Sequence, residues 1–463
     1  MSVRKNHIVV IGAGPGGYVA AIRAAQLGAH VTLIEKDKLG GTCLNRGCVP
    51  TKSLLQSASM LSLIKKAETF GISAKSLFLD FTAVCRRKQR VVEQMLGGVE
   101  LLMKNNNVTV VRGIATITKQ GMLRIIGSEE KIIEADKIII ATGSEPVSPP
   151  IEGIHEEGVM NTDEALRMEK LPKSIIIIGG GFIGLEFAQI FQRMNVKVTI
   201  IEMMPQILPT EDSDIAQMLG RILKREGIDT YTNAKVQCIG TSKQGDRIVS
   251  FSAKEEEKKL VADKVLIAVE RIPYMRNLGL ENLGLAIDAG RIVVNKRMET
   301  TINNIYAVGD VVGGAMLAHV AIAEAICAAQ NAVGLSVEMD YRAVPRCVYT
   351  SPEVAAVGLT EKEAREKYDN VRVGKFPLRA SGKAIVLGER EGIVKFIVDA
   401  EYGQVLGVEI IGPHATELIS EAILGIQLEA TFNDFASVIH AHPTLSETIM
   451  EAALGVEGKS IHI

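Results

Sequence analysis

The sequence predicts an α/β protein in which two units of one pattern are followed by an α+β domain. A glycine-rich turn occurs twice, at residues 12–17 and 179–184, and each copy follows a short apolar strand and opens a helical stretch. The chain has 463 residues. Because single domains usually hold roughly 100–200 residues, several hydrophobic cores are expected.

Composition narrows the class of protein. Hydrophobic residues make up 47% and charged residues 23%, as in globular proteins, and the net charge of -2 gives no general attraction to nucleic acid or anionic membranes. Apolar runs such as 175–178 and 265–269 are far below the ~20 residues that cross a bilayer. No leader pattern precedes the first strand, so we expect a cytoplasmic protein with no nucleic-acid or membrane partner.

The first unit runs from an apolar strand at residues 7–11 to a second strand that ends in Glu35. Between them, Gly12 permits a tight turn, Gly14 lets the backbone approach a pyrophosphate, and Gly17 lets the helix pack on the sheet. The helix amino terminus stabilises the phosphate charge. Glu35 is placed to accept hydrogen bonds from ribose hydroxyls, the alternative being a solvated charge at a strand end. The unit is therefore predicted to be a Rossmann-like dinucleotide-binding domain.

The second unit repeats the pattern with Gly179, Gly181 and Gly184, and its second strand ends in Glu202. A carboxylate at this place repels a 2′-phosphate, and the next four residues, 203–206, include no Lys or Arg to bind one. The second unit is therefore predicted to bind NAD rather than NADP.

The remaining segments complete the domain prediction. A helical pattern is expected at 70–90, short strands at 108–140, a linker at 146–153, and a strand with a turn at 300–310. Strands followed by helices from residue 341 indicate the α+β domain. The predicted domains are a first dinucleotide-binding domain, a second one, a central domain that completes the first site, and an interface domain, at residues 1–147, 148–272, 273–340 and 341–463.

Of the six cysteines, only Cys43 and Cys48 lie close together, in the run GGTCLNRGCVPTK at residues 40–52. A zinc site would need further Cys or His at ligand spacing, and none is near, so no metal is expected. A purely structural pair remains the alternative. However, Cys48 stands at a predicted helix start, where the helix dipole favours a thiolate, and Pro50 suits the first turn. This pattern favours thiol–disulfide exchange.

The run at 40–52 resembles the active-site segment of the pyridine nucleotide–disulfide oxidoreductases, and most closely that of their dihydrolipoamide dehydrogenase branch, which has Ser in place of Thr51. The resemblance covers essentially the whole chain. GAGPGGYVAAIRAAQLG is similar to the family's FAD-binding turn and GGGFIGLEFA to its NAD-binding turn, while HAHPTLSE resembles its carboxyl-terminal acid–base motif. The resemblance implies the cofactors FAD and NAD and an antiparallel homodimer.

The resemblance also implies catalytic roles. Cys48 would face the flavin, and Cys43 would exchange with a dihydrolipoyl dithiol, the two forming the redox-active disulfide. Lys52 would lie beside the flavin ring and pair with Glu186.

From HAHPTLSE, His442 would be the acid–base, acting on the partner subunit's disulfide, with Glu447 as its orienting residue. An imidazole of nearly neutral pKa suits removal of a thiol proton. His440 is interpreted as an ordinary polar residue near a proline turn.

Further cofactor contacts follow from the matched segments IIIATGSEP, NIYAVGD and MLAHVAIAEA, with Asp310 expected to bond the ribitol chain. The expected FAD contacts are Gly113, Thr142, Gly143, Asp310, Met316, Leu317, Ala318 and His319, and the further NAD contacts are Val236 and Glu270. Glu270 departs from the family, which usually has Gly-Arg-Arg-Pro where this chain has ERIP. A bulky anion there would weaken dinucleotide binding.

The implied function is reoxidation of dihydrolipoyl groups carried by 2-oxo acid dehydrogenase complexes or by the glycine-cleavage lipoyl carrier. Glutathione or mercuric ion reductase activity is the alternative within the family, but Glu202 argues against the first, and the tail GVEGKSIHI has no terminal cysteine pair for the second. A redox-silent nucleotide-binding or assembly protein is the alternative outside it. The complete set of predicted catalytic residues argues against that alternative.

Overall fold

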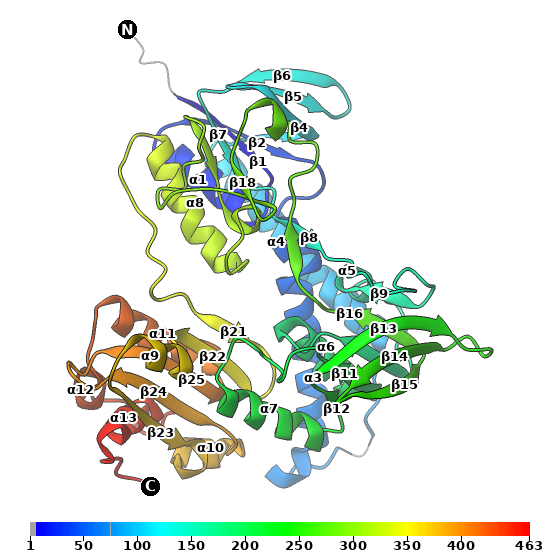
Figure 1. Cartoon of the computed structure of the whole chain (residues 1–463), viewed down its shortest axis with the longest axis vertical. Coiled ribbons are helices and arrows are strands. Elements are labelled where there is room, and N and C mark those ends of the chain that lie inside the picture. Colours follow the sequence, from blue (N-terminus) through cyan, green and yellow to red (C-terminus); the bar gives the residue numbers. More distant parts are fainter. Residues whose placement is uncertain (1–5, 75) are drawn as a thin grey trace.

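The computed structural model describes residues 6–74 and 76–463. Its three regions are visible in Figure 1: a first sheet near the amino terminus, a second sheet in the middle of the chain, and a carboxyl-terminal domain that faces both. No helix in these two ranges is long and apolar enough to cross a bilayer.

The first sheet contains five parallel strands in the order β20-β7-β1-β2-β3. Its strands are almost wholly apolar because both faces are covered. Helices α1 (Pro15–Gln26) and α8 (Ala318–Ala332) cover one face, and the β4-β5-β6 sheet covers the other. The strands are β1 (His7–Ile11), β2 (His30–Glu35), β3 (Thr109–Arg112), β4 (Ile114–Lys119), β5 (Met122–Ile126), β6 (Glu130–Glu134), β7 (Lys137–Ile140) and β20 (Ile305–Ala307).

Strand β20 and helix α8 come from residues 273–340, the segment predicted to complete the first cofactor site. Both share the hydrophobic cores of the first unit, in which Ile305 and Ala307 lie with Val9 and Ile11. The same segment contains η2 (Leu280–Asn282), β18 (Ile287–Asp288), β19 (Arg291–Ile292) and η3 (Gly309–Val312). The first unit is thus built from two distant parts of the chain.

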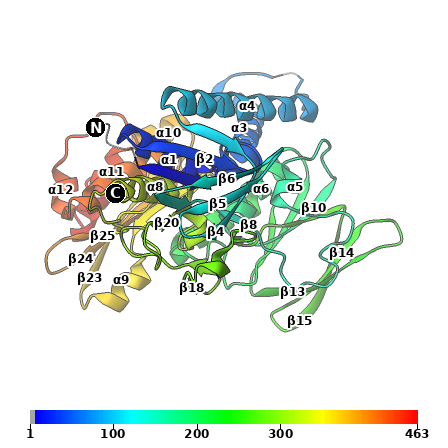
Figure 2. The same ribbon diagram turned by 90° about the horizontal axis from the view of Figure 1, so that it is seen from above.

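The second sheet repeats this plan in the order β12-β11-β10-β16-β9, again parallel. The antiparallel meander β13-β14-β15 packs on one face and lies at the outer edge of the molecule in both views (Figures 1 and 2). The elements are β9 (Val159–Asn161), α5 (Thr162–Ala165), β10 (Ser174–Ile178), α6 (Phe182–Arg193), β11 (Lys197–Ile201), α7 (Ser213–Arg225), β12 (Asp229–Tyr231), β13 (Ala234–Thr241), β14 (Arg247–Ala253), β15 (Glu256–Ala262) and β16 (Lys264–Ile267).

Two connections tie the units together. Strand β8 (Ser144–Pro146) leaves the first unit and pairs with β17 (Arg271–Pro273), on which the chain returns. Helix α2 (Gly41–Arg46) leads into α3 (Cys48–Lys65), whose Leu54 and Leu55 join the core of the second unit. Figure 1 shows α3 running alongside that unit.

The helix predicted at 70–90 is partly wrong. A short 3-10 turn, η1 (Ala67–Phe70), is followed by α4 at Phe81–Asn105, because the Asp80 carboxylate caps the helix by accepting the Ala83 N–H at 2.9 Å. Only three residues of α4 are buried, and its 25 residues extend well past the predicted end at residue 90.

The carboxyl-terminal domain is an antiparallel sheet in the order β21-β22-β25-β24-β23 with helices packed on it, as the α+β prediction requires. Its elements are β21 (Arg346–Val348), β22 (Glu353–Gly358), α9 (Glu361–Lys367), β23 (Val371–Pro377), η4 (Leu378–Ala380), α10 (Gly382–Leu387), β24 (Ile393–Asp399), β25 (Val405–Gly412), α11 (Ala415–Gln427), α12 (Phe432–Ser437), α13 (Glu447–Leu454) and η5 (Gly455–Glu457).

A buried ion-pair network joins this domain to the second unit. The ammonium of Lys395, which is 1% exposed, lies 2.8 Å from Asp212, 3.2 Å from Asp214 and 3.0 Å from Glu361. Burial and the neighbouring Asp212 raise the pKa of Glu409, whose carboxylate lies 3.9 Å from the Lys395 ammonium. Because removal of one partner would leave buried charges uncompensated, the network fixes how the two regions pack.

Candidate active site

The first glycine of each turn occupies backbone that other residues rarely adopt. Gly12 has a φ of 97° and Gly179 a φ of 113°. A Cβ added to Gly12 would lie 2.4 Å from the Ala141 carbonyl oxygen, and one added to Gly179 would lie 2.4 Å from that of Ala268. Both turns therefore need glycine for its conformation and for the close approach of the neighbouring strand.

The other two glycines of each turn also fit dinucleotide binding. Added Cβ atoms would lie 1.7 Å from the Gly12 oxygen at Gly17 and 2.0 Å from the Gly179 oxygen at Gly184, so these glycines let each helix pack on its sheet. Gly14 and Gly181 precede α1 and α6, and neither helix has a side-chain cap. Their first N–H groups are thus available for a pyrophosphate, which fits FAD in the first unit and NAD in the second.

The two acidic residues of the turns have matching environments. Glu35 accepts the N–H of Ala13 at 2.7 Å and that of Asp37 at 2.8 Å, and it is 7% exposed. Glu202 is 8% exposed and accepts the N–H groups of Gly180, at 2.5 Å, and Met204, at 2.7 Å. These bonds fix each carboxylate beside its glycine turn, where the further lone pairs of its oxygens suit ribose hydroxyls.

The other residues predicted to contact FAD cluster at the carboxyl ends of β7 and β20, where open parallel sheets bind ligands. Asp310 lies in η3 and accepts a hydrogen bond from the Ser144 hydroxyl, while the Thr142 hydroxyl donates to the Tyr274 carbonyl at 2.6 Å. Gly143, Met316, Leu317, Ala318 and His319 lie on the adjoining turns and the start of α8, and Gly113 follows β3.

The structure holds Cys43 and Cys48 as free thiols that share a hydrogen bond. That bond from Cys43 lowers the pKa of Cys48 to about 7, against the effect of burial and with help from the charge of Lys52. The same bond, burial and the Cys48 thiolate raise the pKa of Cys43. As expected from the sequence, α3 begins at Cys48. Cys48 is thus the sulfur that carries negative charge in the dithiol form.

Lys52, one turn into α3, forms the expected ion pair with Glu186 of α6. Its ammonium lies 2.9 Å and 2.8 Å from the two carboxylate oxygens, and the Glu186 side chain is only 2% exposed. The Tyr349 N–H donates to Glu186 at 3.1 Å, and the Lys52 ammonium lies 4.4 Å from the centre of the Tyr349 ring. The pair therefore joins the redox segment to the second unit and to the carboxyl-terminal domain.

His442 and Glu447 also meet. The His442 Nδ1 lies 2.8 Å from the Glu447 Oε1, and the other carboxylate oxygen accepts the Thr444 N–H at 2.8 Å. Partial burial alone would raise the pKa of Glu447, yet the bonds from Thr444 and His442 hold that pKa below its usual value. The His442 side chain is 81% exposed, whereas that of His440 is 6% exposed and pairs with Glu421 at 3.0 Å. Only His442 is free to meet a substrate.

Some predicted residues are not brought together. Within residues 6–74 and 76–463, no hydrogen bond or ion pair links His442 to either redox cysteine, and Figure 1 shows α13 well apart from the start of α3. Val236 sits at a bulge of β13, and the exposed Glu270 follows β16.

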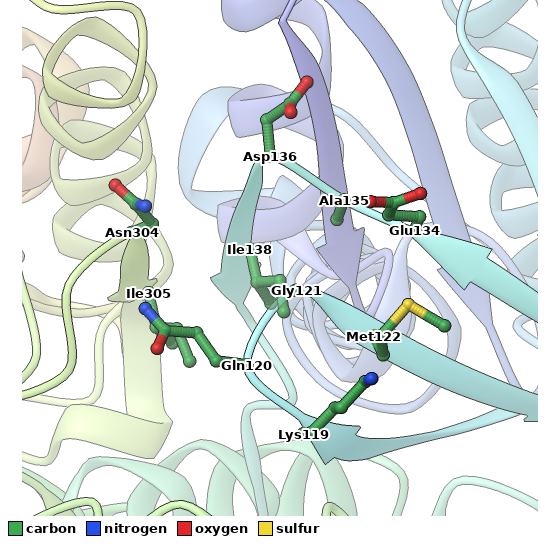
Figure 3. A pocket seen from close by; sticks show the side chains of 10 residues that line it. All are labelled: Lys119, Gln120, Gly121, Met122, Glu134, Ala135, Asp136, Ile138, Asn304 and Ile305. Carbon is green, nitrogen blue, oxygen red and sulfur yellow. The ribbon is translucent and has the colours of Figure 1, made fainter.

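A surface hollow of about 390 Å³ lies elsewhere, beside the β4–β5 turn (Figure 3). Asp136 and Asn304, which line it, precede β7 and β20, so the hollow is at the amino ends of these parallel strands. The cofactor residues lie at the opposite, carboxyl ends. The hollow is therefore separate from the redox site.

Comparison with known proteins identifies the family. Residues 6–325 match the pyridine nucleotide-disulphide oxidoreductase model, and residues 344–453 match the dimerisation domain of the same proteins. The chain belongs to this family. Dihydrolipoyl dehydrogenases from Bacillus subtilis and Thermus scotoductus are 43% and 45% identical to it; the alignments cover 98% of this chain and 99% and 98% of those proteins.

A solved structure has the same fold. The crystal structure of LpdA from Mycobacterium tuberculosis superposes with a TM-score of 0.90 at 27% identity and covers 97% of this chain and 99% of that one. The predicted family, α/β fold class and cofactors FAD and NAD are confirmed, and the matched dimerisation domain makes the oxidoreductase a homodimer.

Sequence reasoning missed several residues that shape the site. Ser144 lies within the matched segment IIIATGSEP and Tyr349 directly follows β21, but neither side chain carries an obvious chemical signal. Glu324, which is 3% exposed, accepts the Gly309 N–H at 2.7 Å and so fixes the turn that presents Asp310. A buried acid in the otherwise apolar helix AHVAIAEAICAA was the available signal.

Proposed function

We propose that this oxidoreductase is a dihydrolipoyl dehydrogenase, which oxidises protein-bound dihydrolipoyl groups and reduces NAD+ through FAD and the Cys43–Cys48 pair. The observation that carries the proposal is the different placement of the two cysteines: Cys48 begins α3, one turn before Lys52, whereas Cys43 lies in the short helix α2. Because the helix start and Lys52 favour a thiolate at Cys48, Cys48 is the better leaving group, and a substrate thiolate attacks the Cys43 sulfur.

The exchange proceeds through a mixed disulfide between the substrate and Cys43. A substrate thiolate attacks the Cys43 sulfur of the oxidised pair, a mixed disulfide forms, and Cys48 leaves as a thiolate. The second substrate thiol, once deprotonated, attacks its neighbouring sulfur in the mixed disulfide and releases Cys43. The substrate leaves as a cyclic disulfide, and the enzyme holds two more electrons on its reduced cysteine pair.

His442 is the group that accepts the substrate proton. The Glu447 carboxylate receives the Nδ1–H, which leaves Nε2 as the basic atom, and it stabilises the imidazolium that forms. Because His442 is exposed and apart from the cysteines of its own chain, we infer that it acts at the disulfide of the second subunit.

The two glycine turns fit dinucleotides, and they indicate which residues would hold each cofactor. Gly12, Gly14, Glu35 and Asp310 would hold FAD, and Gly179, Gly181 and Glu202 would hold NAD. The bound flavin would supply the acceptor for the electron pair of the dithiol, and NAD+ would be the final acceptor. The charge of Lys52 favours the thiolate form of Cys48 for this transfer, and the ion pair with Glu186 holds Lys52 in place.

The physiological partners that we propose are lipoyl domains of 2-oxo acid dehydrogenase complexes or the glycine-cleavage lipoyl carrier. Relatives named dihydrolipoyl dehydrogenase at 40–45% identity support this choice. We also propose a cytoplasmic location, which the free thiols of Cys85, Cys238, Cys327 and Cys347 support, because a reducing compartment keeps such thiols unpaired.

Steady-state assays test the function. The purified holoenzyme should reduce NAD+ with dihydrolipoamide and with a dihydrolipoylated carrier domain. It should show less than about a hundredth of that activity for NADPH-dependent reduction of glutathione disulfide, because Glu202 disfavours a 2′-phosphate. Higher activity with glutathione disulfide than with lipoamide would overturn the proposal.

A further inference from the structure

The loop that begins at Glu202 contacts the glycine turn of the second unit. This loop, residues 202–212, connects β11 to α7. The Glu202 carboxylate accepts the Gly180 N–H at 2.5 Å, and the Leu208 N–H donates to the Gly180 carbonyl at 3.0 Å. A Cβ added to Gly180 would lie 3.1 Å from the side chains of both Glu202 and Ile207. The loop and the turn are therefore packed so closely that a shift of one moves the other.

The loop contains a residue in a strained backbone conformation. Leu208 has a φ of 45°, in the left-handed region that residues other than glycine rarely adopt, and it is 3% exposed. Such a conformation persists only where the surrounding structure holds it. Within the loop, the Glu211 N–H donates to the Leu208 carbonyl at 3.0 Å, and the Gln206 side-chain amide donates to the Glu211 carbonyl at 2.9 Å. The position of Glu211 therefore determines the shape of the loop at Leu208.

The carboxyl-terminal domain holds Glu211 from outside the second unit. The Nε of Arg346, on β21, lies 3.0 Å from one carboxylate oxygen of Glu211, and its Nη2 lies 3.1 Å from the other. Such a bidentate pair fixes orientation as well as distance. The next residue, Asp212, accepts the Glu361 N–H at 2.8 Å and lies 2.8 Å from the Lys395 ammonium. Figure 1 shows α7, which begins directly after these two acids, at the boundary between the second unit and the carboxyl-terminal domain.

We propose that Arg346, acting through Glu211, is a positioning residue for NAD binding. It holds the loop 202–212 in the shape in which Glu202 and the turn at Gly180 receive the adenosine half of the dinucleotide. Because the carboxyl-terminal domain matches the dimerisation domain of the family, the NAD site depends on the domain that joins the two subunits. The inference deepens the proposed function and rests on one part of it, the assignment of NAD to the second unit. An ion pair that only joined the two regions would affect folding stability but not the affinity for a dinucleotide.

Binding of ADP-ribose to the oxidised holoenzyme, measured by calorimetry, tests the proposal. ADP-ribose contains the adenosine, the pyrophosphate and the second ribose of NAD+ but no nicotinamide, so it binds without electron transfer. Arg346→Met should weaken this binding about fivefold, because the binding-competent shape of the loop is then only partly populated. The KM for NAD+ should rise by the same factor, while kcat and the KM for dihydrolipoamide stay near the wild-type values. Hydrogen exchange should quicken in peptides that cover residues 203–212.

Two further variants keep the test independent of folding. Arg346→Met leaves the carboxylate of Glu211, whose side chain is 5% exposed, without its cation, whereas Glu211→Gln leaves an Arg346 side chain that is 29% exposed and can be hydrated. Glu211→Gln should weaken ADP-ribose binding about threefold, because it loses the bidentate pair. The matched control is Lys375→Gln, which removes a cation that crosses the same boundary, 2.6 Å from Asp214 on α7, without reaching the loop. Its affinity for ADP-ribose should equal that of the wild-type protein.

Flavin absorbance and the melting temperature report on folding, and Glu211→Gln decides the question where Arg346→Met does not fold. Unchanged ADP-ribose affinity in the folded, flavin-loaded variant would overturn the role of Arg346. An equal loss of affinity in Lys375→Gln would also overturn it, as would the absence of ADP-ribose binding by the wild-type protein. Failure of the proposed function is a separate result, since the wild-type protein would then lack lipoamide turnover whatever its affinity for ADP-ribose.

Discussion

The two dinucleotide-binding units use the same device but differ in what surrounds it. In both, the first glycine meets a strand carbonyl, the third lets the helix pack, and a buried glutamate accepts the N–H of the residue after the first glycine. In the first unit the redox segment covers the turn, so that a Cβ on Gly41 would lie 2.5 Å from the Gly14 Cα. In the second unit, an added Cβ on Gly181 would meet nothing within 4 Å.

The residues after the two glutamates differ as well. Met203 and Met204, which follow Glu202, are 64% and 43% exposed, whereas the chain after Glu35 enters the redox segment. The same backbone motif therefore serves two kinds of dinucleotide site. Where the chain folds over it, we expect a cofactor that stays bound, and where it remains open, we expect a dinucleotide that exchanges in each turnover.

The largest expected effect comes from adding one methyl group to each unit. Gly17→Ala would place Cβ 1.7 Å from the Gly12 oxygen, and Gly184→Ala would place it 2.0 Å from that of Gly179. The first variant should lose FAD, and the second should keep it but reduce NAD+ about 100-fold more slowly, since overpacking costs roughly 1–3 kcal/mol. Flavin absorbance and steady-state rates measure the two effects. Equal flavin loss in both variants would contradict the assignment of FAD to the first unit and NAD to the second.

His442→Ala should lower lipoamide turnover by a factor of about 100 or more, as expected when a general acid–base is lost. Electron transfer from NADH to a dye, which bypasses the disulfide, should remain near the wild-type rate. The matched control is His440→Ala, because His440 is held against Glu421 and should affect turnover little. A harmless His442→Ala together with a damaging His440→Ala would mean that the other imidazole is catalytic.

The sequence predicted both sheets and the glycine turns because their signals are local. An apolar strand, a glycine turn and an acidic strand end stand within about 30 residues, and each element agrees with the others. The Lys52–Glu186 and His442–Glu447 pairs were expected from the resemblance, and both appear in the structure. Residue spacing alone could not have paired Lys52 with Glu186 across two units.

Long-range features escaped prediction for physical reasons. The placement of β20 in the first sheet depends on packing with β7, and nothing in the strand itself marks that partner. Arg271 carries no signal of its own within ERIP, yet its guanidinium binds Ser144. The network around Lys395 joins residues that lie far apart in the sequence. Each of them, considered alone, therefore resembles an ordinary surface charge.

Substitution of the two corresponding glutamates, Glu35 and Glu202, should have smaller effects that differ between the units. Glu202→Ala should raise the KM for NAD+ about tenfold with little change in kcat, because it removes ground-state contacts to the ribose. Glu35→Ala should leave that KM unchanged and instead release FAD during dialysis. Wild-type protein should prefer NAD+ to NADP+, and comparable kcat/KM for the two would remove the role assigned to Glu202.

The smallest expected effect concerns Glu270, an exposed carboxylate that follows the carboxyl end of β16, the end at which open parallel sheets bind ligands. A like charge near an anionic dinucleotide costs on the order of 1 kcal/mol at a solvated site. Glu270→Gly should therefore tighten NADH binding several-fold and strengthen NADH inhibition, with FAD content unaltered. Calorimetry at two salt concentrations checks this result. Unchanged constants would show that Glu270 is a solvated strand-end residue.

Electrons pass through Cys43 and Cys48 in the proposed reaction, and replacement of Cys48 removes this route. In flavin-loaded Cys48→Ser protein, reduction of NAD+ by dihydrolipoamide should be abolished, while transfer from NADH to a dye should continue. Mass mapping of the wild-type protein should find these two cysteines as the only pair that is oxidised and reduced in turnover. Full lipoamide activity in Cys48→Ser would contradict the account.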